Sequence, residues 1–184
     1  MKKNESYRIL KYPPSYLGNY LSIRGDVTDS GIPVEFIKNN GDKWVYIFSH
    51  IGDKPIQIFN IGENQYFLVI ISGIAYITDK ENENSIKEIA CGISEIFETK
   101  RQIILIENYS IIIIENVNKI KHFQSSNFSD IRENRIENGV LKGVLDYNFQ
   151  KTKYEIDLQN LEFNRISETN KNTETNRKWW QIMK

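Results

Sequence analysis

The side chains in this sequence best suited to acid–base chemistry are two histidines. His50 lies close to Asp53, a spacing that would suit a base and its orienting carboxylate, and His122 supplies a second imidazole. Acid–base catalysis requires such groups to converge within hydrogen-bond reach, whereas these residues fall on separate predicted turns. Two histidines without further spaced ligands also make a poor metal site. Strand-end or surface histidines are therefore the favoured interpretation, and no cofactor is expected.

Cys91 is the single cysteine, so no intramolecular disulfide can form. It would be a nucleophile only if the fold placed it beside His50 or His122. Its neighbours Ala90 and Gly92 belong to an apolar segment. This setting is typical of a small packed side chain with an inert thiol.

Three carboxylates form the remaining chemical candidate. Asp130, Asp146 and Asp157 would have to pair as the acid and base of a small hydrolase. Many solvated strands carry as many acidic residues, so an enzyme is the alternative reading here and a non-catalytic protein is the preferred one.

Length and composition bound the class of protein. The 184 residues suit one domain, expected over residues 1–166, with an irregular part at 1–41 and a polar tail at 167–184. The irregular part leaves room for short strands around residues 20–23 and 34–37. The 24 basic and 24 acidic residues balance, which argues against nucleic-acid binding because that requires a basic footprint. The apolar stretch at 67–77 is far shorter than the roughly 20 residues of a membrane helix. The absence of a secretory signal pattern favours a cytoplasmic location.

Two isoleucine-rich runs, at residues 103–106 and 111–114, give the clearest structural signal. Successive strand residues point to opposite faces, so a continuous β-branched run has no face suited to water. Four residues separate the runs, a length typical of a hairpin. We therefore expect a covered antiparallel pair at the centre of the fold.

Other segments extend this strand-after-strand pattern, with turns too short for parallel crossovers. Asn138-Gly139 favours the positive φ angles of a type I′ hairpin turn. Residues 154–158 alternate apolar and acidic side chains. Residues 85–98 have apolar residues at helical spacing but also contain Gly92, and two strands are preferred over one helix there. The predicted fold is mainly β, an antiparallel sandwich or curled sheet with at most one or two short helices.

Residues 67–163 resemble a largely uncharacterised family of small bacterial β-rich proteins. The matching pieces are residues 72–79 (sGxaYxxd in the family), the strand beginning at Gly92, the isoleucine hairpin, residues 126–145 (SWDGxRdLxI followed by GxxxG) and residues 154–158 (fxxDL). This order is the reason for preferring strands around Gly92. The resemblance implies a mainly β fold without established catalytic residues.

Aromatic side chains indicate where a partner would bind. Tyr46, Tyr66 and Tyr76 alternate along predicted strands, where they would line an outward face or cover the core. The tail ends in Trp179 and Trp180, which would dock on the domain or meet a partner. Asp130 joins these five as a candidate partner-binding residue.

The function expected from these features is protein binding without catalysis. By analogy with other small bacterial proteins, the partner would be a cognate toxin and this chain its immunity protein. A small hydrolase using acidic residues and a glycan or small-ligand binding protein are the alternatives. The sequence leaves the oligomeric state open.

Overall fold

The computed structural model describes residues 6–15, 18, 20–25, 31–52 and 55–166. These residues form strands and turns and contain no helix, and the strands make four four-stranded sheets that do not close into a barrel. The predicted mainly β fold is therefore confirmed. The chain divides into two compact units, one formed by residues 1–93 and 115–118 and the other by residues 94–114 and 119–184. The expected single-domain organisation of residues 1–166 stays a prediction.

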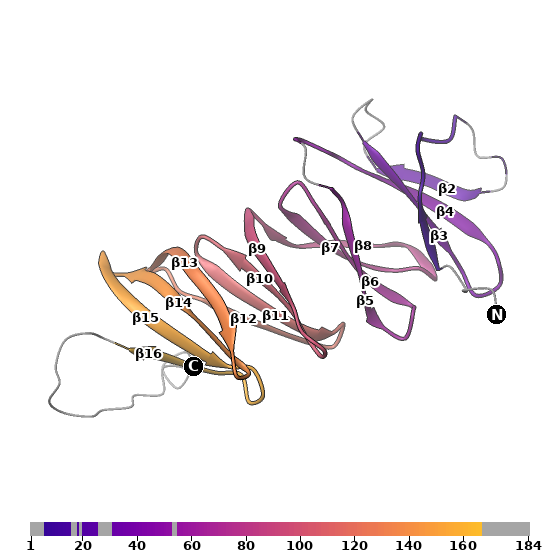
Figure 1. Cartoon of the computed structure of the whole chain (residues 1–184). Coiled ribbons are helices and arrows are strands. Elements are labelled where there is room, and N and C mark those ends of the chain that lie inside the picture. The colour runs from indigo at the N-terminus through magenta and orange to yellow at the C-terminus, as the bar shows by residue number, and fades with distance from the viewer. Residues whose placement is uncertain (1–5, 16–17, 19, 26–30, 53–54, 167–184) are drawn as a thin grey trace, which may run out of the picture. The chain divides into compact units, whose positions relative to one another are not determined.

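The first unit contains two sheets (Figure 1), in the orders β1-β3-β4-β2 and β5-β6-β7-β8. The pairing is antiparallel except between β2 and β4, which run parallel. The strands are β1 (Tyr7–Ile9), β2 (Tyr20–Gly25), β3 (Ile32–Ile37), β4 (Lys43–Phe48), β5 (Gln57–Gly62), β6 (Tyr66–Ile71), β7 (Ile74–Asp79) and β8 (Asn82–Cys91). Strands β2 and β3 thus cover the two places considered for short strands in the irregular stretch 1–41, and β1 adds a third strand there.

Apolar side chains from β3, β4 and β6 fill the space between these two sheets. Trp44 is at the centre of this core, stacked on Phe36 with ring centroids 4.5 Å apart. Its indole nitrogen donates to the Lys80 carbonyl oxygen at 2.7 Å, which satisfies the one polar group of a buried ring. Strand β4 is therefore an inner strand of its sheet, and its apolar side chains pack in this core.

The second unit also has two sheets (Figure 1), in the orders β12-β11-β10-β9 and β13-β14-β15-β16. Their strands are β9 (Ile93–Glu98), β10 (Ile103–Glu107), β11 (Ser110–Asn116), β12 (Lys119–Gln124), β13 (Phe128–Glu137), β14 (Val140–Tyr147), β15 (Gln150–Asp157) and β16 (Glu162–Ile166). The segment at 85–98 forms parts of β8 and β9, so the strand interpretation is confirmed.

The isoleucine runs pair as predicted, with Ile103 opposite Ile114 and Ile106 opposite Ile111 in a regular ladder. All eight side chains of the two runs are buried. The side chains on one face of this hairpin form a core cluster with Leu141, Tyr154 and other residues of β13–β15. Burial of both faces explains why the two isoleucine-rich runs lack polar residues.

Candidate functional site

Strand β13 carries two β-bulges that change which of its side chains face outward. Ser129 pairs with Asp146 and Arg132 with Val144, so three steps along β13 match two along β14; the same shift recurs before Arg135. A bulge of this kind inserts one extra residue and bends the strand. Two residues beside the shifts, Asp130 and Glu133, have φ angles of 50° and 56°.

The bulges keep two side chains in the core while the charged residues between them turn outward. Ile131 is buried in the core cluster, and Asn134 bonds inward to Tyr154. Asp130 and Glu133 are exposed, and Arg132 lies beside them at the surface. A regularly alternating strand would have sent some of these charges into the core. The bulges therefore let consecutive charged residues share one face.

Charged side chains of three strands form this outward surface, which we name the bulged face. The register places most of them on the side of the sheet opposite the core residues of β14 and β15. Asp130 and Glu133 lie in the bulges and join the surface through Arg132 and Lys151. Its members are Asp130, Arg132, Glu133, Arg135, Glu137, Lys142, Asp146, Lys151, Lys153 and Glu155. Acids and bases alternate in it, so it has no basic footprint of the kind that nucleic acids require.

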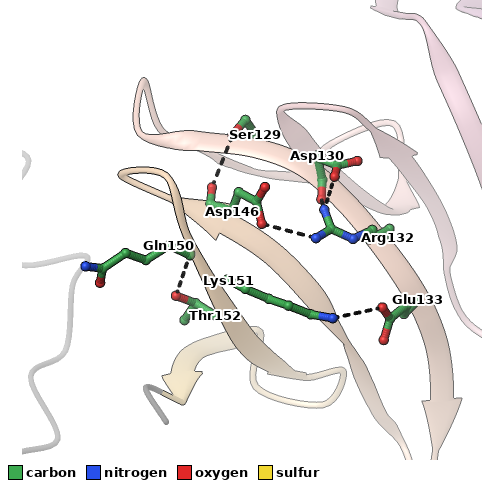
Figure 2. Close-up of polar contacts among 8 residues, drawn as sticks. All are labelled: Ser129, Asp130, Arg132, Glu133, Asp146, Gln150, Lys151 and Thr152. Carbon is green, nitrogen blue, oxygen red and sulfur yellow. Dashed lines mark hydrogen bonds and ion pairs between the residues drawn. The ribbon is translucent and has the colours of Figure 1, made fainter. Parts of the chain in front are cut away.

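Arg132 is the centre of one cluster on the bulged face (Figure 2). Its guanidinium donates to the carbonyl and carboxylate oxygens of Asp130 and, at 3.2 Å, to Oδ1 of Asp146. Figure 2 also shows Lys151 reaching from β15 to Oε1 of Glu133 at 3.3 Å. The five side chains alternate in sign across three strands.

Two hydrogen bonds from side chains to backbone carbonyls lie on the strands that carry this cluster. Ser129 donates from its hydroxyl to the Asp146 carbonyl at 3.5 Å, and Thr152 donates to the Gln150 carbonyl at 3.1 Å (Figure 2). The first contact joins β13 to β14, and the second stays within β15. The charged groups therefore stand on ordered strands rather than on a loop.

A second cluster lies nearer the turn between β13 and β14. Arg135 donates from Nε to Glu137 at 2.7 Å, while Lys142 Nζ lies 3.6 Å from Glu137 and 3.3 Å from Glu155. The hydrogen bond from Arg135 is the main cause that lowers the pKa of Glu137 below its usual value. This carboxylate is therefore ionised at neutral pH.

Buried polar groups support the bulged face from below. The hydroxyl of Tyr154 donates to Oδ1 of Asn134, and Nδ2 of Asn134 donates to Glu95 on β9 at 2.9 Å. Burial, with a smaller contribution from Glu95, raises the pKa of Tyr154 far above its usual value. Gly143 makes room for this network, because a Cβ there would lie 2.5 Å from Asn134 Oδ1 and 2.8 Å from the Tyr154 ring.

The structure brings together two of the three acids that the sequence suggested for hydrolysis and places the third apart. Asp130 and Asp146 meet around one guanidinium and are ion-paired. Asp157 lies at the other end of the β14–β15 ladder, where Oδ1 accepts the Gln159 backbone N–H at 2.7 Å. Its carboxylate therefore caps a turn.

The histidines and the cysteine occupy ordinary positions. His50 Nδ1 lies 3.3 Å from the Ser72 hydroxyl, and His122 is exposed on β12. Asp53 lies outside the described residues. Cys91 is exposed at the end of β8, so the expectation of a packed thiol is wrong; Ala90 takes the buried side, and strand alternation turns Cys91 outward.

The aromatic candidates fall in different places. Tyr46 and Tyr76 pack against the core of the first unit, with ring centroids 4.7 and 5.3 Å from that of Phe48. Tyr66 is half-buried at the start of β6. Trp179 and Trp180 lie outside the described residues. A partner-binding role for these five residues stays a prediction.

The first unit has its own charged group, built around Glu35 on β3. Glu35 is 3% exposed, and its Oε1 accepts no hydrogen bond from the residues that the structure describes. Arg8 and Lys43 lie 3.9 and 3.7 Å from its carboxylate oxygens. Burial and the hydrogen bond to this carboxylate raise the pKa of Tyr20. Nearby cations offset the buried charge, as a structural role requires.

Sequence reasoning found Asp130 but missed the residues around it. Arg132, Glu133 and Lys151 lie in an acidic and basic stretch that looks like any solvated strand. One signal was present: Phe128, Ile131 and Asn134 are spaced by three, whereas a regular strand requires a spacing of two. Such a shift in period is what paired bulges produce.

Comparison with known proteins leaves the family open. No family model matches the sequence, and no curated protein gives a significant match. Within the described ranges, no three or more His, Cys, Asp or Glu side chains are grouped so as to hold a metal ion. The same part of the chain contains no helix that is long and apolar enough to cross a membrane.

Proposed function

We propose that this chain is a cytoplasmic, non-enzymatic protein-binding module that binds its partner through the bulged face. The observation that carries the proposal is the pair of bulges in β13, which places Asp130, Arg132, Glu133 and Arg135 together on one exposed surface. Bulges are features that re-aim side chains, and left-handed backbone at a non-glycine residue is a form of strain that concentrates at functional sites.

The chemistry of the face favours a protein as its partner. Acids and bases lie close together on this face. It would therefore complement a partner surface that carries the opposite charge at each matching position. The carboxylates Asp130 and Asp146 are engaged by Arg132, an arrangement better suited to recognition than to proton transfer. Ion pairs at an exposed face add little to stability, so stability alone does not account for this cluster of charges.

We further propose that the partner is a toxin of the same cell and that this chain neutralises it. The support is the resemblance to small bacterial proteins and the type of molecule, a β scaffold with a charged face. Cells that express the partner protein without this chain should grow more slowly. Growth should recover when this chain is expressed with it, and continued inhibition would remove the immunity role.

Calorimetric titration tests the binding function. The probes are the purified proteins encoded by the reading frames on either side of this gene, and one of them should bind. The double variant Arg135→Glu/Lys151→Glu should weaken binding at least about tenfold, because like charges across an interface cost more than the roughly 1.4 kcal/mol that a factor of ten represents. Binding should also weaken with added salt.

A matched control carries the same charge change elsewhere. Lys87 and Lys100 are exposed and lie outside the bulged face. The variant Lys87→Glu/Lys100→Glu should bind as the wild type does. Equal weakening by both double variants, or no heat with either neighbouring protein, would contradict the proposal.

A further inference from the structure

The hairpin between β14 and β15 presents one aromatic ring entirely to solvent. Tyr147 and Gln150 pair across a two-residue turn made of Asn148 and Phe149. The φ angles of these turn residues are 48° and 63°, as a type I′ turn requires. Phe149 is fully exposed. The turn therefore holds a large apolar side chain where no part of the described chain covers it.

The other end of β14 provides a direct comparison. There, Asn138 and Gly139 form the turn between β13 and β14, with φ angles of 50° and 77°. Asn-Gly is the preferred pair for this turn because glycine adopts positive φ without steric cost. Phe149 occupies the equivalent place with a bulky side chain, so the turn gives up stability. Neither packing nor turn geometry explains this choice of residue.

Contacts at the base of the hairpin fix the direction of the tip. The guanidinium of Arg165 lies 4.0 Å from the ring centroid of Tyr147, and the Phe128 ring packs on the same tyrosine at 6.2 Å. The Asn148 N–H donates to the Asn127 carbonyl at 3.2 Å. A tip held in this way loses little conformational entropy on binding.

We propose that Phe149 is the aromatic anchor of the interface and inserts into an apolar pocket of the partner protein. This inference rests on the proposed function. Asp146 and Lys151, on the rung next to Tyr147 and Gln150, begin the bulged face, so the ring stands at the border of the charged surface. Interfaces concentrate binding energy in aromatic anchors surrounded by polar contacts that exclude water. The rim of that pocket should therefore carry basic residues opposite the acids of the bulged face and acidic residues opposite its bases.

The test replaces Phe149 by a photoreactive p-benzoylphenylalanine in the full chain, in the cells that naturally produce it. Irradiation should join it to one protein, identified by mass spectrometry, then purified and titrated against this chain by calorimetry. The same photoreactive residue at Gly41, in the turn between β3 and β4, should give no such product. Crosslinking of the chain to itself alone would mean a second copy occupies the face and would overturn the proposal.

Two variants then separate anchoring from a structural role. Phe149→Gly should bind the identified protein at least about 30-fold more weakly, the loss typical of a central interface residue, yet should melt at a higher temperature than the wild type. Gly139→Phe moves the same ring to the other tip and should lower the melting temperature, because phenylalanine at positive φ strains the turn.

Unchanged affinity of Phe149→Gly would overturn the anchor. If Arg135→Glu/Lys151→Glu still weakened binding in that case, the protein-binding function would stand and only the role of Phe149 would fall. If neither variant changed the affinity, both proposals would fall. A lower melting temperature for Phe149→Gly would show that the ring serves the fold, which also overturns the anchor.

Discussion

Two hairpins of the second unit, β10–β11 and β13–β14, use the same antiparallel pairing for opposite purposes. The first is regular and buries every side chain of its two isoleucine runs. The second is interrupted by two bulges and turns one face to water. Side-chain chemistry accounts for the difference, because a strand without polar residues must be covered on both faces, whereas a charged strand must keep its charges out. Irregularity occurs where the surface is polar.

The largest loss of stability should come from a charge placed in the regular hairpin. Ile113 is completely buried, so Ile113→Asp should lower the free energy of unfolding by on the order of 4 kcal/mol or more, because an unpaired carboxylate loses its hydration. Urea unfolding followed by circular dichroism measures this. Ile113→Val should cost only about 0.5–1.5 kcal/mol. Wild-type stability of Ile113→Asp would refute the buried position.

The next largest effect should come from the glycine beneath the bulged face. Gly143→Ala forces a Cβ against Asn134 and Tyr154, which should lower the free energy of unfolding by about 1–3 kcal/mol, as overpacking does. The neighbouring Lys142→Ala, on the other side of the strand, should cost less than about 1 kcal/mol. Equal effects of the two substitutions in thermal melts would mean that the polar network does not fill the space above Gly143.

Removing the hydroxyl of that network should have a comparable or smaller effect. Tyr154→Phe leaves Asn134 Oδ1 without its donor and should cost about 1–2 kcal/mol at neutral pH. The raised pKa of Tyr154 adds a pH dependence, because the unfolded tyrosine ionises near pH 10 while the folded one stays protonated. The stabilisation that comes from this difference in pKa between the folded and unfolded states is present below pH 10 and is lost as the pH rises beyond it.

Urea titrations on either side of pH 10 check this sign. The wild type should lose more stability than Tyr154→Phe when the pH is raised, since the variant lacks this ionisable group. The other tyrosines are common to both proteins and cancel in the difference. An equal loss in the two proteins would show that Tyr154 is not shielded from water.

The smallest effect on stability should come from the charged face itself. Arg132→Ala should change the free energy of unfolding by less than about 1 kcal/mol, because partly exposed ion pairs contribute little. The same variant should weaken binding of the partner. A large destabilisation in urea unfolding would mean that the cluster around Arg132 serves the fold, and the contrast between the two hairpins would lose its functional meaning.

Residue type alone predicted the parts of the fold that local chemistry decides. The isoleucine runs had only one suitable environment, and Asn138-Gly139 had one suitable turn. Strands at 85–98 also followed, although helical spacing competed there. In each case the preference was a property of a few adjacent residues.

Other features depended on contacts distant in the sequence. The bulges form because Ile131 and Asn134 both have inward partners on other strands, which the sequence of β13 does not display. Cys91 was expected to be buried because its neighbours are apolar. Side chains alternate between the two faces of β8, however, and this one points outward. The turn at Asn148 was hidden by Phe149, since a phenylalanine is not expected at positive φ.

Lysine footprinting tests most directly whether the bulged face is a binding surface. Each lysine of the full chain would be acetylated with and without the identified partner, and its rate of modification measured by mass spectrometry. Lys142, Lys151 and Lys153 should be modified more slowly in the complex, while Lys87 and Lys100 keep their rates. Unchanged rates at the first three lysines, in a complex that demonstrably forms, would show that the partner binds elsewhere.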